Sequence, residues 1–318
     1  MYHIILQEMV LCKRCIHSME KIIVTNIDNI GDPMILLEDD TYYMYSTYDG
    51  GVPFHVYTSK DKKTFTDMGV CLSPEHTFAS SDIWAPEVIK YQGKYYMFYS
   101  GRSAWDGIMH VQIAVSDSPL GPFKDIVKDP IVNIPGKSTI DGHCFIENDE
   151  KYLFFSMDCA TNIIDGIHTS QIYCVKLADD FKSVVGDYVF ISTPSKDFEK
   201  FSGPSWRWNE GPFVLKHKNK YYLTYSTNCY NSLWYSVGCY VSDNIMGPYV
   251  LQEERPILSY IENKMSGPGH NAFFIDKDGK LKCVFHIHTH YDAPSGIRTA
   301  CICDAYFDEN DKLVIDYK

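Results

Sequence analysis

Short apolar and aromatic runs separated by polar turns recur along this chain. The clearest stretch, NEGPFVLKHKNKYYLTYS, spans residues 209–226 and opens with an acid at a Gly-Pro turn. A short apolar run, a polar cluster and an aromatic run follow, and two such runs joined by a polar turn predict a β-hairpin. No segment shows a sustained helical period of apolar residues, so we expect an all-β fold.

The same hairpin pattern occurs five times, and its second runs start at Tyr42, Tyr95, Tyr152, Tyr221 and Leu281. Successive copies lie 53, 57, 69 and 60 residues apart, which is long for a helical repeat but fits four short strands. Each hairpin is followed by a further strand, turn and strand, such as IAVSDSPLGPFKDI. Four-stranded units repeated around an axis are propeller blades, so we predict a five-bladed β-propeller with antiparallel blades around a central funnel.

The repeats predict a single propeller domain over residues 19–318. Residues 1–18, MYHIILQEMVLCKRCIHS, show no repeat, and we expect an N-terminal extension outside the fold. This stretch lacks the apolar core and small-residue cleavage site of a signal peptide. No apolar run reaches the ~20 residues of a membrane span. We therefore expect a cytoplasmic protein that does not bind membranes.

Composition narrows the range of partners. The chain has 41 acidic and 29 basic residues, a net charge of −12, which argues against nucleic acid as a partner. Its 24 tyrosines suit β-strands and surfaces that face sugars. The 11 cysteines predict reduced, buried thiols, and the C-x-x-C pair Cys12 and Cys15 has no second pair with which to bind zinc.

Acidic residues stand at the front of three repeats. Asp32, Asp141 and Glu210 each lie ten or eleven residues before the second run of their repeat, and His270 takes this place in the fifth. The inner strands of a propeller begin around one central funnel, so these side chains should face one another. An acid before Gly or Pro can also simply start a turn. Three acids in register, one of them a glutamate, favour a shared site over three turns.

Converging acids with aromatic walls suit glycoside hydrolysis, in which one carboxylic acid protonates the leaving oxygen while a carboxylate activates water or attacks. With these elements in order, the chain resembles glycoside hydrolase family 43, whose five-bladed propeller enzymes invert the anomeric configuration. The matching elements are GDPMIL, SDIWAPEV, TIDGHCF, NEGPFVLK and GPGHNAFF, from about Ile30 to the C-terminus. The third contains Asp-Gly-His where Asp-Pro is common, which leaves the part played by His143 open.

The resemblance implies a role for each matching residue. Asp32 would be the general base that activates water, and Glu210 the general acid that protonates the leaving oxygen. Asp141 would raise the pKa of the acid and orient it. His270 would lie under the catalytic centre near a bound cation, for which calcium is the expectation, and no organic cofactor is expected. Arg298, in GIRTACICDA, resembles an arginine that binds substrate hydroxyls.

Aromatic residues near these motifs are candidate sugar contacts. Trp84 stands at a blade start, Trp206 and Trp208 come just before the acid, and Phe54 follows the first hairpin. A flat apolar ring serves equally well in a core or against a sugar. We expect Trp84, Phe54 and Trp208 to contact substrate.

Three histidines alternate along one predicted strand, at His286, His288 and His290. A period of two puts them on one side, which is typical either of a metal site or of donors at a pocket rim. Because no carboxylates are nearby in sequence, we favour the rim and expect His288 to contact substrate.

The resemblance implies a pentose-containing oligosaccharide or polysaccharide as substrate. The long insert between the third and fourth repeats would raise a wall beside the acid and favour release of terminal units. The fifth repeat runs to the last residue of the sequence, so we do not expect the additional β-sandwich of many xylosidase-type relatives. We therefore expect an α-L-arabinofuranosidase, with β-xylosidase or endo-arabinanase as alternatives.

Two other classes remain open. A non-catalytic carbohydrate-binding propeller would not need the three acids. A retaining fructan-type hydrolase would use the first-blade aspartate as a nucleophile, but such enzymes usually carry Arg-Asp-Pro where this chain has Ile-Asp-Gly.

Overall fold

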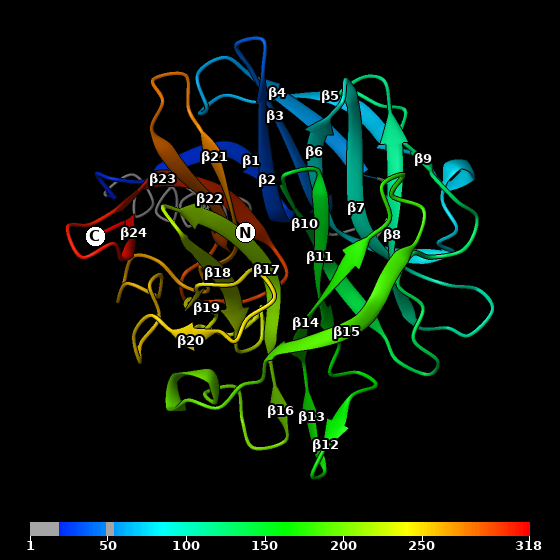
Figure 1. Cartoon of the computed structure of the whole chain (residues 1–318). Coiled ribbons are helices and arrows are strands. Elements are labelled where there is room, and N and C mark those ends of the chain that lie inside the picture. Colours follow the sequence, from blue (N-terminus) through cyan, green and yellow to red (C-terminus); the bar gives the residue numbers. More distant parts are fainter. Residues whose placement is uncertain (1–18, 49–53) are drawn as a thin grey trace, which may run out of the picture.

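The computed structural model describes residues 19–48 and 54–318, so the expected extension at 1–18 lies outside the described residues. The described residues form five antiparallel sheets of four or five strands and one further three-stranded sheet. Figure 1 shows the sheets arranged around a common centre. We call the five larger sheets blades 1 to 5, in the chain order of their innermost strands. The predicted all-β class and four-stranded units are confirmed.

In the first four blades the strands follow one another along the chain. Blade 1 consists of β2 (Ile30–Glu38), β3 (Thr41–Tyr48), β4 (Phe54–Ser59) and β5 (Thr66–Leu72). Blade 2 consists of β6 (Ser81–Tyr91), β7 (Lys94–Arg102), β8 (Met109–Ser116) and β9 (Lys124–Asp125). Blade 3 consists of β10 (Thr139–Glu147), β11 (Glu150–Met157), β14 (Gln171–Leu177) and β15 (Val184–Ser192). Blade 4 consists of β17 (Asn209–His217), β18 (Lys220–Thr227), β19 (Ser236–Ser242) and β20 (Val250–Leu251).

Blade 5 closes the ring with strands from both ends of the described chain. Its inner strands are β21 (Gly269–Ile275), β22 (Leu281–His288) and β23 (Arg298–Phe307). Both β1 (Ile23–Asp28) and β24 (Leu313–Asp316) pair with β23. The first strand of each blade contacts that of the next, and β21 contacts β2, so the ring is closed. The sequence pattern predicted β24 but not the contribution of β1.

Apolar clusters fill the spaces between neighbouring blades, because each sheet buries both of its faces. The tyrosines that start the second strands, Tyr42, Tyr95, Tyr152 and Tyr221, are all buried there. Three of their hydroxyl groups donate to carboxylates, among them those of Tyr42 and Tyr152 to Asp276 and Glu150. The Tyr221 hydroxyl, for example, donates to Glu147 Oε2 of blade 3 at 2.5 Å. This double use of one side chain explains why tyrosine recurs at this place in the repeat.

All five innermost strands shift register just after they begin, β6 at Ser81/Trp84 and Trp84/Glu87 and the others at Gly31/Met34, Ile140/His143, Glu210/Phe213 and Gly269/Ala272. The bulge residues Asp32, Asp141, Gly211 and His270 have φ values of 52°, 58°, 58° and 46°. A left-handed residue in a bulge re-aims its side chain away from the normal alternation of the strand. Asp32, Asp141 and His270 therefore occupy equivalent positions, whereas Glu210 stands one residue earlier.

The connections on the face where the inner strands begin carry the main additions to the fold. In each blade the second strand returns to this face, so the loop between the second and third strands lies there. In blade 3 that loop contains β12 (Ile163–Ile164) and β13 (Ile167–Thr169). Strand β13 pairs in parallel with β16 (Trp206–Arg207), just before β17. This three-stranded sheet projects at the lower edge of Figure 1.

Helices are nearly absent from the described part of the chain, which contains two 3-10 turns, η1 (Pro74–His76) and η2 (Asp197–Glu199). None of the helices found among residues 19–48 and 54–318 is long and apolar enough to cross a membrane.

Candidate active site

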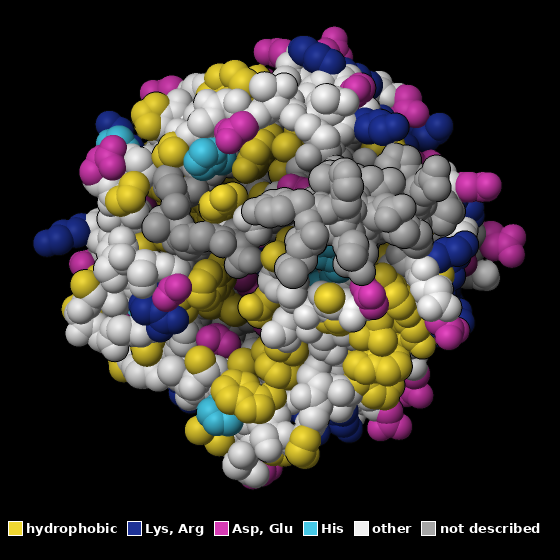
Figure 2. Space-filling model, turned by 180° about the vertical axis from the view of Figure 1, so that it is seen from behind, with side chains coloured by type: hydrophobic (Ala, Val, Ile, Leu, Met, Phe, Trp, Pro, Cys, Tyr) yellow, Lys and Arg dark blue, Asp and Glu magenta, His cyan; other side chains and the backbone are white. Residues whose placement is uncertain are grey.

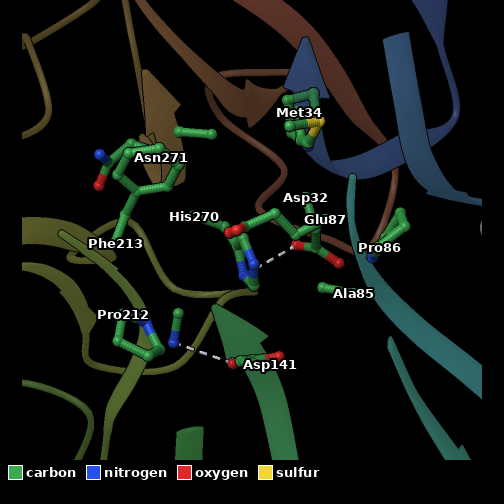
Figure 3. Close-up of a pocket in the computed structure, with 14 residues that line it drawn as sticks. Asp32, Met34, Ala85, Pro86, Glu87, Asp141, Pro212, Phe213, His270 and Asn271 are labelled. Atoms are coloured by element: carbon green, nitrogen blue, oxygen red, sulfur yellow. Dashed lines mark hydrogen bonds and ion pairs between the residues drawn. The ribbon is translucent and has the colours of Figure 1, made fainter. Parts of the chain in front are cut away.

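The acids of blades 1, 3 and 4 come together where the inner strands begin. Asp32, Asp141 and Glu210 are 9%, 6% and 9% exposed, respectively. Asp32, Asp141 and His270 line a small central cavity, as Figure 3 shows. Glu210 lies beside this cavity, and its charge interacts with those of both aspartates. Buried carboxylates that face one another are costly to ionise together, which makes this cluster the candidate active site.

Asp32 is held in its ionised form. Burial by itself would raise the pKa of its carboxyl group, but the nearby cationic Arg298 and the ring of His270 outweigh burial and hold that pKa well below its usual range. Arg298 Nη1 donates to Asp32 Oδ1 at 2.9 Å, and His270 Nδ1 lies 3.4 Å from the same oxygen. Burial lowers the pKa of His286 well below its usual value, so this ring is neutral and we assign the effect on Asp32 chiefly to Arg298.

The glycine before Asp32 makes room for this ion pair. A Cβ atom on Gly31 would lie 2.0 Å from Arg298 Cζ, so only glycine lets the guanidinium pass so close to the strand. Arg298 Nε also donates to the carbonyl oxygen of Gly296 at 3.1 Å, and the guanidinium lies 5.0 Å from the centre of the Tyr230 ring. The glycine of the first-blade GDP motif thus serves to position the arginine.

The pKa of Glu210 is shifted in the opposite direction to that of Asp32. Burial raises the pKa of its carboxyl group well above the usual value, and the negative charges of Asp141 and Asp158 raise it further. The Tyr235 hydroxyl, 3.2 Å from Glu210 Oε1, opposes this rise. Burial also raises the pKa of Asp141, although the Gly211 N–H donates to its Oδ2 at 2.9 Å. Glu210 is therefore protonated under conditions in which Asp32 is ionised.

Each bulge residue that carries a site side chain is fixed through its backbone by the preceding blade. The N–H of Asp141 donates to Ser100 Oγ at 3.0 Å, and that of His270 donates to Ser226 Oγ at 2.7 Å. The N–H of Asp32 donates to His286 Nδ1 at 3.1 Å. The second strands of the first four blades carry Ser46, Ser100, Ser156 and Ser226 one or two residues before they end, and that of blade 5 carries His286 there. This regular polar ending was a signal that the sequence analysis did not use.

His143 supports the inner strands from behind the site. Its Nδ1 lies 2.7 Å from Glu87 Oε2 of blade 2, and its Nε2 accepts the N–H of Val214 in blade 4 at 2.9 Å. Because Nε2 accepts a hydrogen bond, the ring is the tautomer with its proton on Nδ1, which donates to Glu87. The role of His143, which the third-blade motif left open, is therefore to connect three blades.

Two of the expected substrate contacts are corrected by the structure. Phe54 is 1% exposed and packs edge-to-face on Tyr99 in the core between blades. His288 is 2% exposed, with Nδ1 bonded to Ser266 Oγ at 2.9 Å and Nε2 to the carbonyl oxygen of Tyr230 at 2.8 Å. The Phe54 ring is therefore too buried to contact a sugar, and both ring nitrogens of His288 already have hydrogen-bond partners. Of the three alternating histidines, it is His286 that reaches the site.

The other expected contacts lie on the catalytic face. Arg298 is in the site, beside Asp32. Trp84 is half-buried on β6 opposite Ser100, outside the lining of the central cavity. Trp208 is half-buried beside Trp206, with ring centres 6.0 Å apart and ring planes at 17°. The substrate contacts of Arg298, Trp84 and Trp208 stay predictions.

Tyr235 and Asp158 were missed by the sequence analysis. Both lie in or beside loops between the second and third strands, Tyr235 in blade 4 and Asp158 directly after β11. Because loop residues lack the spacing of the repeat, no periodic signal pointed to them. Gly269 leaves room for the Tyr235 ring, since a Cβ atom on this residue would lie 2.3 Å from the tyrosine ring.

The expected calcium ion would have few protein ligands beside His270. Calcium binds about six to eight oxygen atoms. The nearest carboxylate, Asp32, is already paired with Arg298, although the buried Asn271 Oδ1 in the same cavity lacks a hydrogen-bond partner. Among the described residues, no group of three or more His, Cys, Asp or Glu side chains is arranged to hold a metal. The protein donors alone do not make a calcium site, so this ion stays a prediction.

Comparison with known proteins agrees with this geometry. The family model "Glycosyl hydrolases family 43" matches residues 24–313. A solved thermostable family-43 glycoside hydrolase is 42% identical with a TM-score of 0.87, and the match covers 92% of this chain and 94% of that one. A solved endo-1,4-β-xylanase from Bacteroides thetaiotaomicron is 31% identical with a TM-score of 0.81, covering 95% and 97%. An extracellular exo-α-(1→5)-L-arabinofuranosidase of Streptomyces avermitilis is 25% identical, covering 83% of this chain and 56% of that protein.

Proposed function

Since this chain belongs to glycoside hydrolase family 43 and is a glycoside hydrolase, we propose that it inverts the anomeric configuration and releases terminal α-L-arabinofuranosyl units from oligosaccharides. The ring of five sheets is the five-bladed propeller of this proposal. One observation carries the assignment of roles. Asp32 and Glu210 are both buried, yet their surroundings shift their pKa values in opposite directions. Such a pair provides a base and an acid at the same pH.

In the proposed reaction, Asp32 accepts a proton from a water molecule as the water oxygen attacks the anomeric carbon. Glu210 donates its proton to the glycosidic oxygen as the bond from that oxygen to the anomeric carbon breaks. The products are a free sugar of inverted configuration and a shortened alcohol, with Asp32 protonated and Glu210 ionised. Water then exchanges the protons and restores both groups.

Arg298 and Asp141 support the two groups in different ways. The ion pair with Arg298 keeps Asp32 ionised and fixes its Oδ1. The same pair lowers the basicity of Asp32, so its contribution depends on its position against the water more than on base strength. Asp141 places a negative charge near Glu210 and so favours the protonated form of the acid.

Two observations support a single terminal arabinofuranosyl unit as the group released. The three carboxylates are at most 9% exposed, which suits a closed pocket rather than an open cleft. The exo-α-(1→5)-L-arabinofuranosidases of Streptomyces avermitilis and Streptomyces chartreusis are 25% and 28% identical to this chain. β-Xylosidase and endo-arabinanase are the alternatives that the experiment must separate.

The test is a substrate panel combined with anomer analysis. We expect hydrolysis of 4-nitrophenyl α-L-arabinofuranoside to exceed that of the β-D-xylopyranoside, β-D-galactofuranoside and β-D-galactopyranoside. Linear arabinan should release arabinose rather than longer fragments. Proton NMR of the first product should show the inverted anomer. A retained anomer would contradict the roles of Asp32 and Glu210, and preferred hydrolysis of the xyloside would contradict the sugar assignment.

A further inference from the structure

Three flat rings form a column beside the acid on the catalytic face. The rings of His168 and Trp206 lie 4.0 Å apart with planes at 11°, and those of Trp206 and Trp208 lie 6.0 Å apart with planes at 17°. His168 comes from β13 and Trp206 from β16, and the two residues are direct partners in the parallel pair. We call these three residues the aromatic column.

The column leads directly to Glu210. Trp206 in β16, Trp208 between the two strands and Glu210 in β17 are alternate residues, and alternate side chains of an extended chain point to the same side at steps of about 7 Å. Thr227 Oγ1 donates to the carbonyl oxygen of Trp208 at 2.8 Å, which continues the β17–β18 hairpin back to the column. The side chain of Asn209, between them, is directed the other way and is fully buried, with its Nδ2 3.4 Å from Ser192 Oγ.

Polar contacts fix the column from below. His168 Nδ1 lies 2.9 Å from the carbonyl oxygen of Cys159, which orients the ring. The N–H of His168 donates to the carbonyl oxygen of Ser205 at 3.0 Å, and the N–H of Ser170 donates to that of Arg207 at 2.9 Å. Two loops from neighbouring blades are thereby locked together. A short sheet with so few strands is marginal by itself, so these contacts and the stacked rings hold it in place.

A role in holding the loops together does not by itself explain why the aromatic column is exposed. Trp206 is 39% exposed, although its ring would be covered if the stack served only as a small core. In Figure 2, hydrophobic side chains and a histidine gather on the part of the surface that projects at the lower edge, where Figure 1 places β12, β13 and β16. An ordered, exposed aromatic surface next to a catalytic acid is the kind of surface on which a sugar ring stacks.

We propose that the aromatic column binds the sugar units of the leaving group, so that the substrate is an oligosaccharide chain at least two units longer than the released sugar. The column is assigned to the leaving-group side of the scissile bond because Glu210 donates its proton to the leaving oxygen and the column extends from Glu210. This inference rests on the proposed function for the direction of the chain. It adds the length and the position of the substrate.

The test compares a chain substrate with one that cannot reach the column. With α-1,5-linked arabinotriose, Trp206→Ala should raise KM about 5- to 10-fold while kcat changes little, because stacking aids binding more than the chemical step. With 4-nitrophenyl α-L-arabinofuranoside, whose leaving group is a single ring, the same variant should change kcat/KM at most about twofold. Trp206→Phe should recover much of the loss with the trisaccharide.

Trp105→Ala is the matched control. Trp105 is 55% exposed and stacks on His110, with ring centres 5.6 Å apart, but it lies in the β7–β8 loop of blade 2. Its variant should leave both substrates unaffected. The proposal is overturned if Trp206→Ala changes both substrates equally or neither, or if Trp105→Ala raises KM for the trisaccharide just as much.

Binding separates this proposal from the proposed function. Calorimetry with the Glu210→Gln variant and either arabinotriose or β-1,4-linked xylotriose measures affinity without turnover. If wild type hydrolyses neither sugar, the proposed function fails, yet a loss of binding on adding Trp206→Ala would still support the column. If wild type hydrolyses arabinotriose but Trp206→Ala leaves affinity and KM unchanged, the column proposal fails alone.

Discussion

Asp32 and Glu210 carry the same functional group and similar burial, so their neighbours decide what each can do. Asp32 faces the guanidinium of Arg298, whereas Glu210 faces the carboxylates of Asp141 and Asp158. A pair of titratable groups whose surroundings separate their pKa values identifies the acid and the base. The sequence could place the carboxylates in register. It could not show Tyr235 or Asp158, whose loop positions follow no repeat.

Replacing the acid should remove most activity. Glu210→Gln keeps the size of the side chain but cannot donate a proton, so kcat should fall at least about 100-fold with an unactivated arabinoside. The loss should be smaller with 4-nitrophenyl α-L-arabinofuranoside, because 4-nitrophenolate leaves without full protonation. Initial rates on both substrates measure this difference.

Glu254→Gln provides the control for that variant. Glu254 is an exposed carboxylate paired with Lys196, so the same chemical change there should leave both rates unaltered. Near wild-type turnover of the unactivated substrate by Glu210→Gln would show that another group is the acid.

Two neighbours of Glu210 should move the alkaline limb of the pH profile in opposite directions. The acid works when protonated, so kcat/KM falls as the pH rises through its pKa. Asp141→Asn removes a negative charge, which lowers the pKa of Glu210 and moves the limb to lower pH by about one unit. Tyr235→Phe removes a hydrogen bond that stabilises the ionised form, which raises this pKa and moves the limb to higher pH.

The opposite signs make this pair of variants informative. Both substitutions will also reduce the rate, but a general loss of structure would lower the whole profile without moving the limb. The measurement is kcat/KM for one aryl arabinoside across the pH range. Limbs that stay in place, or that move in the same direction, would contradict the assignment of Glu210 as the group that titrates there.

At the scale of the strand, the bulge decides how closely the sequence could predict the site. Counting along the repeats put the acids within one residue of a common position, and the structure brings them together. Glu210 stands one residue before the bulge because Gly211 takes the left-handed place that Asp32 and Asp141 fill in their strands. A bulge adds a residue to one strand without changing its composition, so the sequence pattern did not reveal it.

The same limit explains Phe54 and His288. A period of two tells which side of a strand a residue faces but not whether that side ends in solvent, in a cavity or against another blade. Aromatic rings and imidazoles occur in all three of these environments. Phe54 meets Tyr99 of the next blade, and His288 meets Ser266 and Tyr230, because the blades pack closely where the second strands end.

The link made by His143 should matter for stability more than for chemistry. His143→Ala leaves the Glu87 carboxylate and the Val214 N–H without their buried partner, which should lower the free energy of unfolding by about 2–3 kcal/mol. Denaturant unfolding of the purified variant measures this. His55→Ala, which removes a partly exposed histidine paired with Asp67, should cost less than about 1 kcal/mol. Equal losses in the two variants would contradict the role of His143 between blades.

At the scale of the whole molecule, the fold depends on closing a ring. Five sheets in line would leave the first and last with an uncovered face, but β21 contacts β2 and buries both. Blade 5 is completed by β1 from one end of the described chain and β24 from the other. The repeats predicted the ring, because the five copies resemble one another. The closing strand β1 precedes the first copy and resembles none of them, so comparison of the repeats could not reveal it.

Two truncations should separate the expected extension from the closing strand. Removing residues 1–18 should change the melting temperature by no more than about 2 °C and leave kcat on an aryl arabinoside unaltered, because the repeats predict a fold that starts after them. Removing residues 1–28 also deletes β1 and the buried Met19 and Ile22, which pack in the cluster of blades 4 and 5. Strand β23 then loses a partner along its outer edge.

The longer truncation should lower the melting temperature by at least about 5 °C, because the ring loses both backbone pairing and buried apolar area. Arg298 begins β23 and Thr299 is the partner of Asp28, so the weakened edge lies directly beside the ion pair with Asp32. Activity should therefore fall before the fold does as temperature rises. Parallel loss of activity and structure, or equal behaviour of the two truncations, would show that β1 does not hold the site in place.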